Sequence, residues 1–467
     1  MTGSISIPSA SGTMLCRFSA VELHVASFDA ILITAMRTLV LIVALTAAMP
    51  ALGAEAPKIF QNEWCWCLLP TIVAERPSSR SNVGYSMAVG ADGRIYFAGT
   101  EPRSEPDLGS GWTLKAMSQA GEVVWSRTFT WRRNYYDVAR SIALCPDGRI
   151  AVAGYSEFSR NSPIPARWLV GVYSADGQPV WSDTISDANL IRAEAAACDP
   201  DGRLTVVGWR TRRQTVQSSF WLIRSYKPDG KTAWTRTFGG DLAGRDRAHA
   251  VAAEKDGHIL VAGKLDEGSG RSAWCLLRLT PKGAVSWSRT FTGPDSWQDE
   301  PCAVAVGKNG RIALAGKVSA GPAEQVNWMV MVLDGSGNRI WSRTHNGEKS
   351  MDDKAFAVTF DGCGRVIVAG YENGDVAQNP PYDAGEWAVH VYTPDGELIR
   401  HMHRAEMETM PGSAFGAALV PDGVLIAGFE QTSVIGQTRW IHKKVKLPDC
   451  AGKKEAPATG SVRHSKP

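Results

Sequence analysis

Four aspartates stand at the same place in a repeated pattern, each twelve residues after a tryptophan. They are Asp137, Asp246, Asp299 and Asp353. Carboxylates that recur in this way could bind a cation or a hydroxylated ligand. They could equally accept hydrogen bonds from the backbone N–H groups of their own loops. Because a residue that repeats in register more often supports the repeat, we favour the structural role and keep ligand binding as the alternative.

Cysteine and histidine pairs give two weaker indications of metal chemistry. Cys65 and Cys67 form a Cys-x-Cys pair, but zinc sites usually need a second pair and the sequence has none. His401 and His403 lie in a methionine-rich segment, 400–410, whose soft ligands would suit Cu(I). We expect a structural disulfide or a buried thiol in the first case and a solvated strand edge in the second, and no metal site in either.

The elements that would position these residues are short strands around glycine turns. The segment CPDGRIAVAGYS, residues 145–156, reads as strand, turn and strand, because glycine adopts positive φ without a Cβ clash. The motif occurs seven times, with turns at Asp92, Asp147, Asp201, Asp256, Asn309, Cys363 and Asp422. Successive turns lie 53 to 59 residues apart, a period that indicates repeats too small to bury their own cores.

A second pattern fills the interval between turns: Trp, eight residues, Gly, three residues, Trp. Five copies follow it fully, the first from Trp112 and the last from Trp328, whereas the copy at Trp387 ends in Arg400. Each repeat therefore contains four strands, two around each turn. The strand before the Asp-Gly turn is rich in small residues, which suit the crowded axis of a radial array. These features predict an all-β fold, a seven-bladed β-propeller of four-stranded antiparallel blades.

The repeat resembles the bacterial SBBP-type β-propeller repeat. The resemblance is carried by W-x-L-x-x-Y-x-x-D-G-x-x-x-W and by A-V-x-x-D-G-x-I-x-V-A-G, as in RTFGGDLAGRDRAHAVAAEKDGHILVAG from Arg236. It covers roughly Gly84 to Leu447. It implies an extracytoplasmic propeller and no particular activity. Tryptophans replace smaller aromatic or aliphatic residues in the third and fourth strands, which departs from the family pattern.

The seventh repeat lacks a fourth strand. Asp449 stands where other repeats have the turn glycine, and Cys450 and the tail follow. A spare segment, EWCWCLLP at 63–70, precedes the first repeat. We expect this segment to form the outer strand of the last blade, because closing the ring removes an open sheet edge. That pairing would bring Cys450 near the Cys-x-Cys pair, and we predict a Cys67–Cys450 disulfide in an oxidising compartment.

The N-terminal region carries an export signal. The stretch MRTLVLIVALTAAMPALGAEA from Met36 has a basic residue, an apolar core and small residues, like a secretory signal peptide, and its core is short for a membrane span. We expect translation to start at Met36; the alternative is an uncleaved anchor with a cytosolic leader. Residues 1–53 are then leader plus signal peptide, 57–450 the propeller and 451–467 a disordered tail. The protein would be periplasmic or secreted.

Composition narrows the function. With 44% hydrophobic residues, 46 glycines and a formal net charge of +3, the chain suits a soluble globular protein and argues against nucleic acid or an anionic membrane as partner. We expect an exported module that binds a protein or glycan at a channel mouth, where the four aspartates would lie, or at a blade edge. The alternative is a quinoprotein-like oxidoreductase, or a glycan hydrolase or lyase, with residues from several blades meeting at the axis; no cofactor is indicated. Facing carboxylates or a cationic cluster in a deep pocket would favour the enzyme, and self-satisfied aspartates at a shallow mouth would favour binding.

Overall fold

The computed structural model describes two hairpin strands near the N-terminus and most of residues 83–450. Gaps fall at 103–108, 132–134, 159–165, 213–217, 240–243, 269–270, 294–297, 320–325, 375–384, 408, 422, 432–437 and 448–449. The chain divides into two compact bodies, Met1–Trp66 and Cys67–Pro467. In the first, β1 (Thr2–Ser9) pairs with β2 (Gly12–Ser19) in an antiparallel hairpin. The expected signal peptide, the Cys-x-Cys segment and the tail lie outside the described residues.

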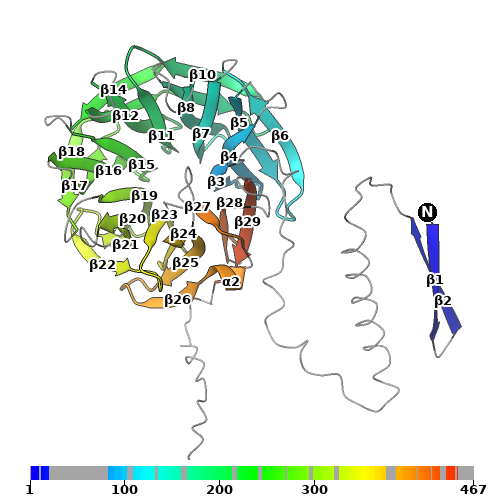
Figure 1. Cartoon of the computed structure of the whole chain (residues 1–467). Helices are drawn as coiled ribbons and strands as arrows, with labels where there is room; N and C mark the ends of the chain where they lie inside the picture. Colours follow the sequence, from blue (N-terminus) through cyan, green and yellow to red (C-terminus); the bar gives the residue numbers. More distant parts are fainter. Residues whose placement is uncertain are drawn as a thin grey trace, which may run out of the picture. The chain divides into compact units, whose positions relative to one another are not determined.

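The second body consists of antiparallel sheets arranged around a centre (Figure 1). The strands follow the sequence repeats in order. Repeat one has β3 (Val83–Val89), β4 (Ile95–Pro102), β5 (Gly109–Met117) and β6 (Val123–Phe129); repeat two has β7 (Tyr135–Leu144), β8 (Ile150–Glu157), β9 (Arg167–Tyr173) and β10 (Pro179–Ile185). Repeat three has β11 (Ile191–Cys198), β12 (Leu204–Thr211), β13 (Ser219–Tyr226) and β14 (Thr232–Phe238); repeat four has β15 (Arg247–Ala253), β16 (Ile259–Gly268), β17 (Arg271–Leu279) and β18 (Val285–Phe291). Repeat five has β19 (Glu300–Val306), β20 (Ile312–Ser319), β21 (Val326–Leu333) and β22 (Arg339–His345). Repeat six has β23 (Asp352–Phe360), β24 (Val366–Gly374), β25 (Glu386–Tyr392), β26 (Leu398–Met402) and the short helix α2 (Arg404–Met407); repeat seven has β27 (Gly412–Val420), β28 (Gly423–Gln431) and β29 (Thr438–Val445).

Within each repeat, consecutive strands pair as antiparallel hairpins, and the first strand lies nearest the centre (Figure 1). A short parallel contact between β5 and β7 joins repeats one and two into one eight-stranded sheet. The last repeat lies beside the first, because β27 and β28 contact β3. The prediction of an all-β propeller built from four-stranded antiparallel sheets is confirmed at this level. The number of blades and the N-terminal outer strand stay predictions.

Tryptophans form the contacts between neighbouring repeats. The third-strand tryptophans are fully buried, and the Trp221 indole N–H donates to the Lys264 carbonyl of the next repeat at 3.0 Å. The fourth-strand tryptophans reach the outer turn of the next repeat. The Trp234 N–H donates to the Pro281 carbonyl at 3.0 Å, and its ring covers Gly283, where an added Cβ would lie 2.7 Å from the ring. The spacing Trp, Gly, Trp thus reflects docking between repeats, because the outer turn glycine of each of repeats two to six lies against the tryptophan of the preceding repeat.

This packing explains why repeat six departs from the pattern. Arg400 occupies the place of its outer tryptophan, and in the sequence repeat seven has Asp449 in place of the turn glycine. Both partners of the docking contact are therefore replaced at the same junction. The outer strand β26 is also short, with five residues.

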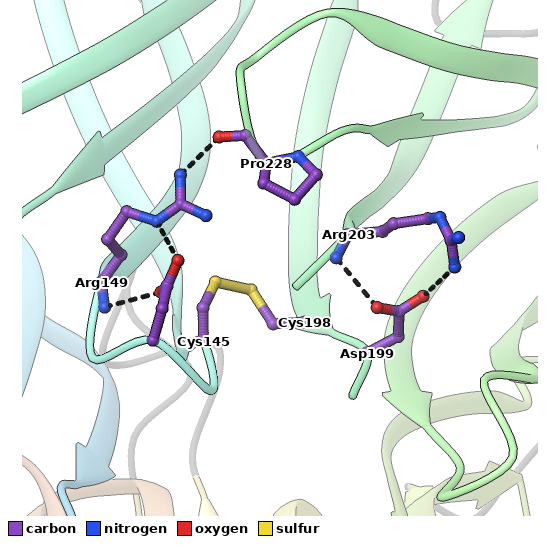
Figure 2. The surroundings of a disulfide bond; sticks show 7 residues. Cys145, Arg149, Cys198, Asp199, Arg203 and Pro228 are labelled. Atoms are coloured by element: carbon purple, nitrogen blue, oxygen red, sulfur yellow. Dashed lines mark hydrogen bonds and ion pairs between the residues drawn. A yellow bond between two sulfur atoms is a disulfide. The ribbon is translucent and has the colours of Figure 1, made fainter. Parts of the chain in front are cut away.

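Two disulfides lie near the Asp-Gly turns. Cys145, in the turn of repeat two, is bonded to Cys198 at the end of the inner strand of repeat three (Figure 2). Beside this bond, the Arg149 guanidinium donates to the carbonyl of Pro228 in repeat three. The two neighbours are therefore joined covalently and by hydrogen bonding.

The second disulfide, Cys363–Cys450, corrects the predicted Cys67–Cys450 pair. Strand β29 runs antiparallel to β28, so its end at Val445 lies at the turn side of the sheet, and Cys363 occupies the turn of repeat six. Cys450 therefore meets a cysteine of the neighbouring repeat. Cys67 lies outside the described residues.

Candidate functional site at the mouth of the central channel

The four repeated aspartates lie at the loops that enter the inner strands, and their carboxylates are buried. Asp299 accepts hydrogen bonds from the backbone N–H of Gly293, at 2.7 Å, and of Ser319, at 2.9 Å. The first donor belongs to the entry loop and the second to the end of the second strand. The Asp299 carboxylate therefore holds the entry loop against the sheet, and we call the four aspartates the clip aspartates.

The other three aspartates show the same arrangement. Asp353 accepts from the N–H groups of Gly347 and Asn373 at 2.6 and 2.8 Å, and Asp137 accepts from the Trp131 N–H at 3.0 Å and from the Ser156 hydroxyl. Asp246 accepts from the Asp266 N–H at 2.7 Å. All four are at most 5% exposed. Burial raises the pKa of Asp353 to about 6. This geometry supports the structural role, because the carboxylates are buried and accept hydrogen bonds from the surrounding backbone, and ligand binding by the four aspartates stays a prediction.

The side chains at the channel instead come from a bulge in each inner strand. Every inner strand has an unpaired residue between its second-strand partners at the same place in the repeat, which is the geometry of a β-bulge and changes the direction of that side chain; β23 has a further irregularity at Asp353. We call these residues the bulge ring. They are Tyr85, Arg140, Glu194, His249, Cys302, Phe356 and Phe415, and each is half-buried. Where a repeat has the clip aspartate, the bulge residue follows it by three positions.

Contacts between successive repeats show that the bulge ring surrounds one axis. The Arg140 guanidinium lies 3.0 Å from a Glu194 carboxylate oxygen and 4.8 Å from the centre of the Tyr85 ring. On the other side, the ring centres of Tyr85 and Phe415 are 5.7 Å apart, and those of Phe415 and Phe356 are 4.4 Å apart. Side chains from repeats six, seven, one, two and three thus follow one another around the axis. One part of the ring is aromatic and the other is charged.

Charged side chains from the first and second strands extend the charged part. The basic members are Arg140, Arg192, Arg247, Lys264, Lys317 and Lys354, and the acidic members are Glu157, Glu194 and Glu300. The Glu300 carboxylate lies 3.7 Å from the Lys354 ammonium and 4.0 Å from that of Lys317. Burial alone would raise the pKa of Glu300, but these cations hold it well below its usual range. Six cations thus face three carboxylates.

Two of the cations have no ion pair within the described part of the chain. Arg247 stacks over the Trp209 ring, with 4.3 Å between its guanidinium carbon and the ring centre, and its Nε has no hydrogen-bond partner. Burial lowers the pKa of both Arg247 and Lys264, because removing a cation from water disfavours its charged form. A bound anion would compensate both charges. The charged part of the bulge ring is therefore suited to a negatively charged ligand.

Acid–base cleavage of a glycoside makes a specific demand on the carboxyl groups of a site. That chemistry needs one carboxylic acid whose pKa is raised so that it can donate a proton. Burial would raise the pKa of Glu194, but Arg140 and its other positive neighbours hold that pKa below its ordinary value. The pKa of Glu300 is likewise held down by the cations around it. Burial lowers the pKa of His249 to about 4, so this imidazole is neutral at pH 7. The arrangement can bind an anion, and it offers no matched acid and base among these residues.

The bulge ring was not foreseen from the sequence. The available signal was a residue of variable type, three positions after the clip aspartate, set in a strand of small residues. His249 between Ala248 and Ala250 is one example. The common position could not be recognised from the sequence, because no residue type is shared by all seven repeats.

The comparisons with known proteins concern the fold. A family model described as "Domain of unknown function (DUF5122) beta-propeller" matches residues 254–285. No curated protein matches the chain. Among solved structures, the β-propeller domain of the Trilobed protease from Pyrococcus furiosus is 12% identical, with a TM-score of 0.45, covering 81% of this chain and 100% of that chain. The GH93 α-L-arabinofuranosidase of Fusarium graminearum in complex with arabinobiose is 10% identical, with a TM-score of 0.44 and coverage of 66% and 92%. The Hadza microbial sialidase Hz136 is 11% identical, with a TM-score of 0.43 and coverage of 73% and 75%.

The β-propeller class rests on the sheets around a common centre and on the family match. At this level of similarity the solved structures carry no argument about activity. None of the helices in the described part of the chain has the length and apolar composition that crossing a membrane requires.

Proposed function

We propose that the protein is an exported, non-catalytic β-propeller of the cell envelope that binds an acidic glycan at the mouth of its channel. The observation that carries this proposal is the pair of cations without ion pairs, Arg247 and Lys264, in a ring whose other part is aromatic. Cations bind the carboxylates of a uronate-containing glycan. The faces of Phe356 and Phe415 carry partial negative charge and suit the C–H groups of a sugar ring.

The proposal also includes the location of the protein and its architecture. Two disulfides suit an oxidising compartment outside the cytoplasm. The repeats would make seven blades of the SBBP type, with segment 63–70 as the outer strand of the last blade. A protein partner with an acidic segment is the second candidate, since the same cations would bind it, but the aromatic part favours a glycan.

Calorimetric titration of the exported protein with an oligogalacturonate tests the binding. Arg247→Gln and Lys264→Gln remove the two charges while keeping hydrogen-bonding side chains, and Lys231→Gln, at a lysine with 79% side-chain exposure, is the matched control. Each channel variant should bind at least about tenfold more weakly, because one charge-assisted hydrogen bond is worth roughly 1.5–3 kcal/mol. The control should bind as the wild type does.

The titration also separates the alternatives. Binding of an acidic peptide without binding of the oligogalacturonate would show that the site binds a protein partner and not a glycan. Release of new reducing ends or of unsaturated uronates would contradict the non-catalytic proposal in favour of a hydrolase or lyase. A bound chromophore in the purified protein would favour the quinoprotein-like alternative.

A further inference from the structure

A second group of polar side chains lies away from the bulge ring, between repeats five and six. His345 comes from β22 of repeat five, and Glu372, His390 and His401 come from β24, β25 and β26 of repeat six. Their potential ligand atoms all lie within 4.8 Å of one another. Three strands of one repeat and one strand of its neighbour thus direct four metal-binding side chains to one point.

The three imidazoles converge on one carboxylate oxygen. Nε2 of His390, His401 and His345 lies 2.9, 2.9 and 3.0 Å from Oε1 of Glu372. Only His390 is aligned for a hydrogen bond with that oxygen. The Nε2 atoms of His345 and His401 are buried and have no hydrogen-bond partner. Buried polar atoms without partners are costly, so the arrangement calls for a group that would use both nitrogens.

The fold itself does not require these residues. His345 is paired with the third-strand tryptophan, as are Phe129, Phe238 and Phe291 in other repeats. His390 pairs with His401, and the corresponding pairs are Met331 with Ser342 and Leu277 with Ser288. Apolar or small residues therefore suffice at the three histidine positions in these repeats, although the His390 position carries Lys115 in repeat one and Arg224 in repeat three. The Glu372 position is also acidic in repeats one and seven, as Glu101 and Glu430, but the three histidines occur together at this junction.

His390 is also held by residues outside this group of four. The Nδ1 of His390 lies 2.9 Å from the Tyr392 hydroxyl, and the His390 ring stacks on Trp328 with 4.7 Å between centres. A hydrogen bond from Nδ1–H to the tyrosine oxygen would leave Nε2 free of a proton and able to bind a metal. Partners of this kind fix the tautomer and orientation of metal-binding histidines.

From this geometry we propose that His345, Glu372, His390 and His401 bind a divalent transition metal ion, with Zn²⁺ the best fit. Three imidazole nitrogens and one carboxylate oxygen match the ligands and the four-coordination that Zn²⁺ prefers, whereas Ca²⁺ and Mg²⁺ prefer oxygen ligands. The ion would join β22 to β24, β25 and β26. It would secure the short outer strand of repeat six, in which Arg400 stands in place of the outer tryptophan.

The methionines of the same segment do not belong to this site. Met402 and Met407 are buried in the apolar core of repeats six and seven. The His403 ring contacts that of His401, with 4.0 Å between centres, but His403 follows the strand and is not one of the four. The Cu(I) interpretation of the methionine-rich segment is therefore replaced by a histidine and carboxylate site of which the segment supplies one member.

Zinc titration of the metal-depleted exported protein, in competition with a chromophoric chelator, tests the proposal. His345→Phe and His401→Ser introduce residues that other repeats carry at these positions, so both variants should fold. His403→Ala is the control, since it removes the neighbouring histidine only. The wild type and the control should bind a single Zn²⁺. The two variants should bind more than about 100-fold more weakly, because even outer-shell partners of metal ligands are worth 10–100-fold.

Two further readouts connect binding with the site. Co²⁺ should give the intense visible absorption of a tetrahedral site in the wild type and in the control, and a weak spectrum in the two variants. Saturating Zn²⁺ should raise the melting temperature of the wild type and the control only. Absence of Zn²⁺ binding by the wild type, or wild-type affinity in His345→Phe and His401→Ser, would overturn the proposal. Loss of binding in His403→Ala equal to that in His401→Ser would instead assign the metal to the exposed histidine pair.

Discussion

At the scale of single residues, one backbone position gives this molecule its chemical character. The bulge of each inner strand presents a phenol, a guanidinium, a carboxylate, an imidazole, a thiol or a phenyl ring to the same channel. The clip aspartates nearby do the opposite, because they recur without change and stay buried. Their position could be predicted from the tryptophan spacing. The chemistry of the channel could not, because it depends on residues of different type whose proximity arises only when the sheets close around the axis.

Replacing a clip aspartate should destabilise the fold. Asp299→Ala removes the acceptor for two backbone N–H groups, of Gly293 and Ser319, and leaves both donors buried. We expect a loss of about 2–4 kcal/mol in the free energy of unfolding, measured by urea denaturation. Asp176→Ala, at a residue whose side chain is 81% exposed, should stay within about 0.5 kcal/mol of the wild type. Loss of ligand binding by folded Asp299→Ala at unchanged stability would contradict the structural role.

Acid should destabilise the protein partly through His249. Burial lowers its pKa to about 4, against about 6.5 in an unfolded chain. As the pH falls from 6.5 to 4, the unfolded chain takes up a proton that the folded protein does not bind, so stability falls in this window. Glu300, Glu194, Lys264 and Arg247 face the imidazole and contribute to its environment.

The substitution His249→Phe isolates this contribution. Phenylalanine occupies the same bulge position in repeats six and seven, so its size is compatible with the ring. Between pH 7 and pH 4, the wild type should lose about 1–3 kcal/mol more stability than the variant, after allowance for partial exposure. Urea denaturation at the two pH values measures the difference. Equal losses in both proteins would show that His249 does not titrate as its burial indicates.

At the scale of elements, tryptophan and glycine determine how neighbouring repeats join. The four strands of each repeat could be predicted, since the turns and the tryptophans mark them. The reason for the spacing could not, because Trp234 docks on Gly283, in a different repeat. The same limit applies to the proposed zinc site. His401 drew notice within its own segment, but His345 belongs to the preceding repeat and replaces a phenylalanine.

The docking contact can be separated from the backbone requirement for glycine. Gly283 and Gly148 both have positive φ, at 78° and 83°, but only Gly283 lies against a tryptophan; an added Cβ at Gly148 would meet nothing within 4 Å. Gly148→Ala should therefore cost about 1 kcal/mol, from the left-handed conformation alone. Gly283→Ala should cost about 1–3 kcal/mol more, from overpacking against Trp234. Urea denaturation measures the free energy of unfolding of the two variants. Equal losses of stability would mean that the turn at Gly283 accommodates the added methyl group without overpacking against Trp234.

At the scale of the whole molecule, covalent bonds act at two places in the cycle of repeats. Cys145–Cys198 joins repeats two and three across 53 residues, and Cys363–Cys450 joins repeat six to the end of repeat seven across 87 residues. The sequence indicated that Cys450 forms a disulfide but not with which residue, because its partner depends on where β29 ends. The predicted partner came from the assumed path of the N-terminal segment, whereas the turn of repeat six is where the strand arrives.

Peptide mapping of the exported protein without reduction should recover both disulfides. Cys363→Ser should destabilise the protein by up to about 4–5 kcal/mol, and Cys145→Ser by up to about 4 kcal/mol, since the chain-entropy contribution grows with the closed loop. Melting curves of the two variants measure these losses. Recovery of a Cys67–Cys450 peptide in place of Cys363–Cys450 would restore the earlier assignment.

The direction of tryptophan docking bears on how the chain folds as it is made. Trp125 donates to the carbonyl of Ala175, and Trp234 to that of Pro281, so each outer tryptophan is covered by residues about fifty positions closer to the C-terminus. A chain emerging from its N-terminus therefore completes each repeat only when the next one has appeared. Until then the third-strand and fourth-strand tryptophans of the last repeat lack the partners that the next repeat supplies. An interrupted or truncated chain therefore ends in uncovered tryptophans, an apolar surface that would promote aggregation and would be available to the quality-control machinery that recognises exposed apolar side chains.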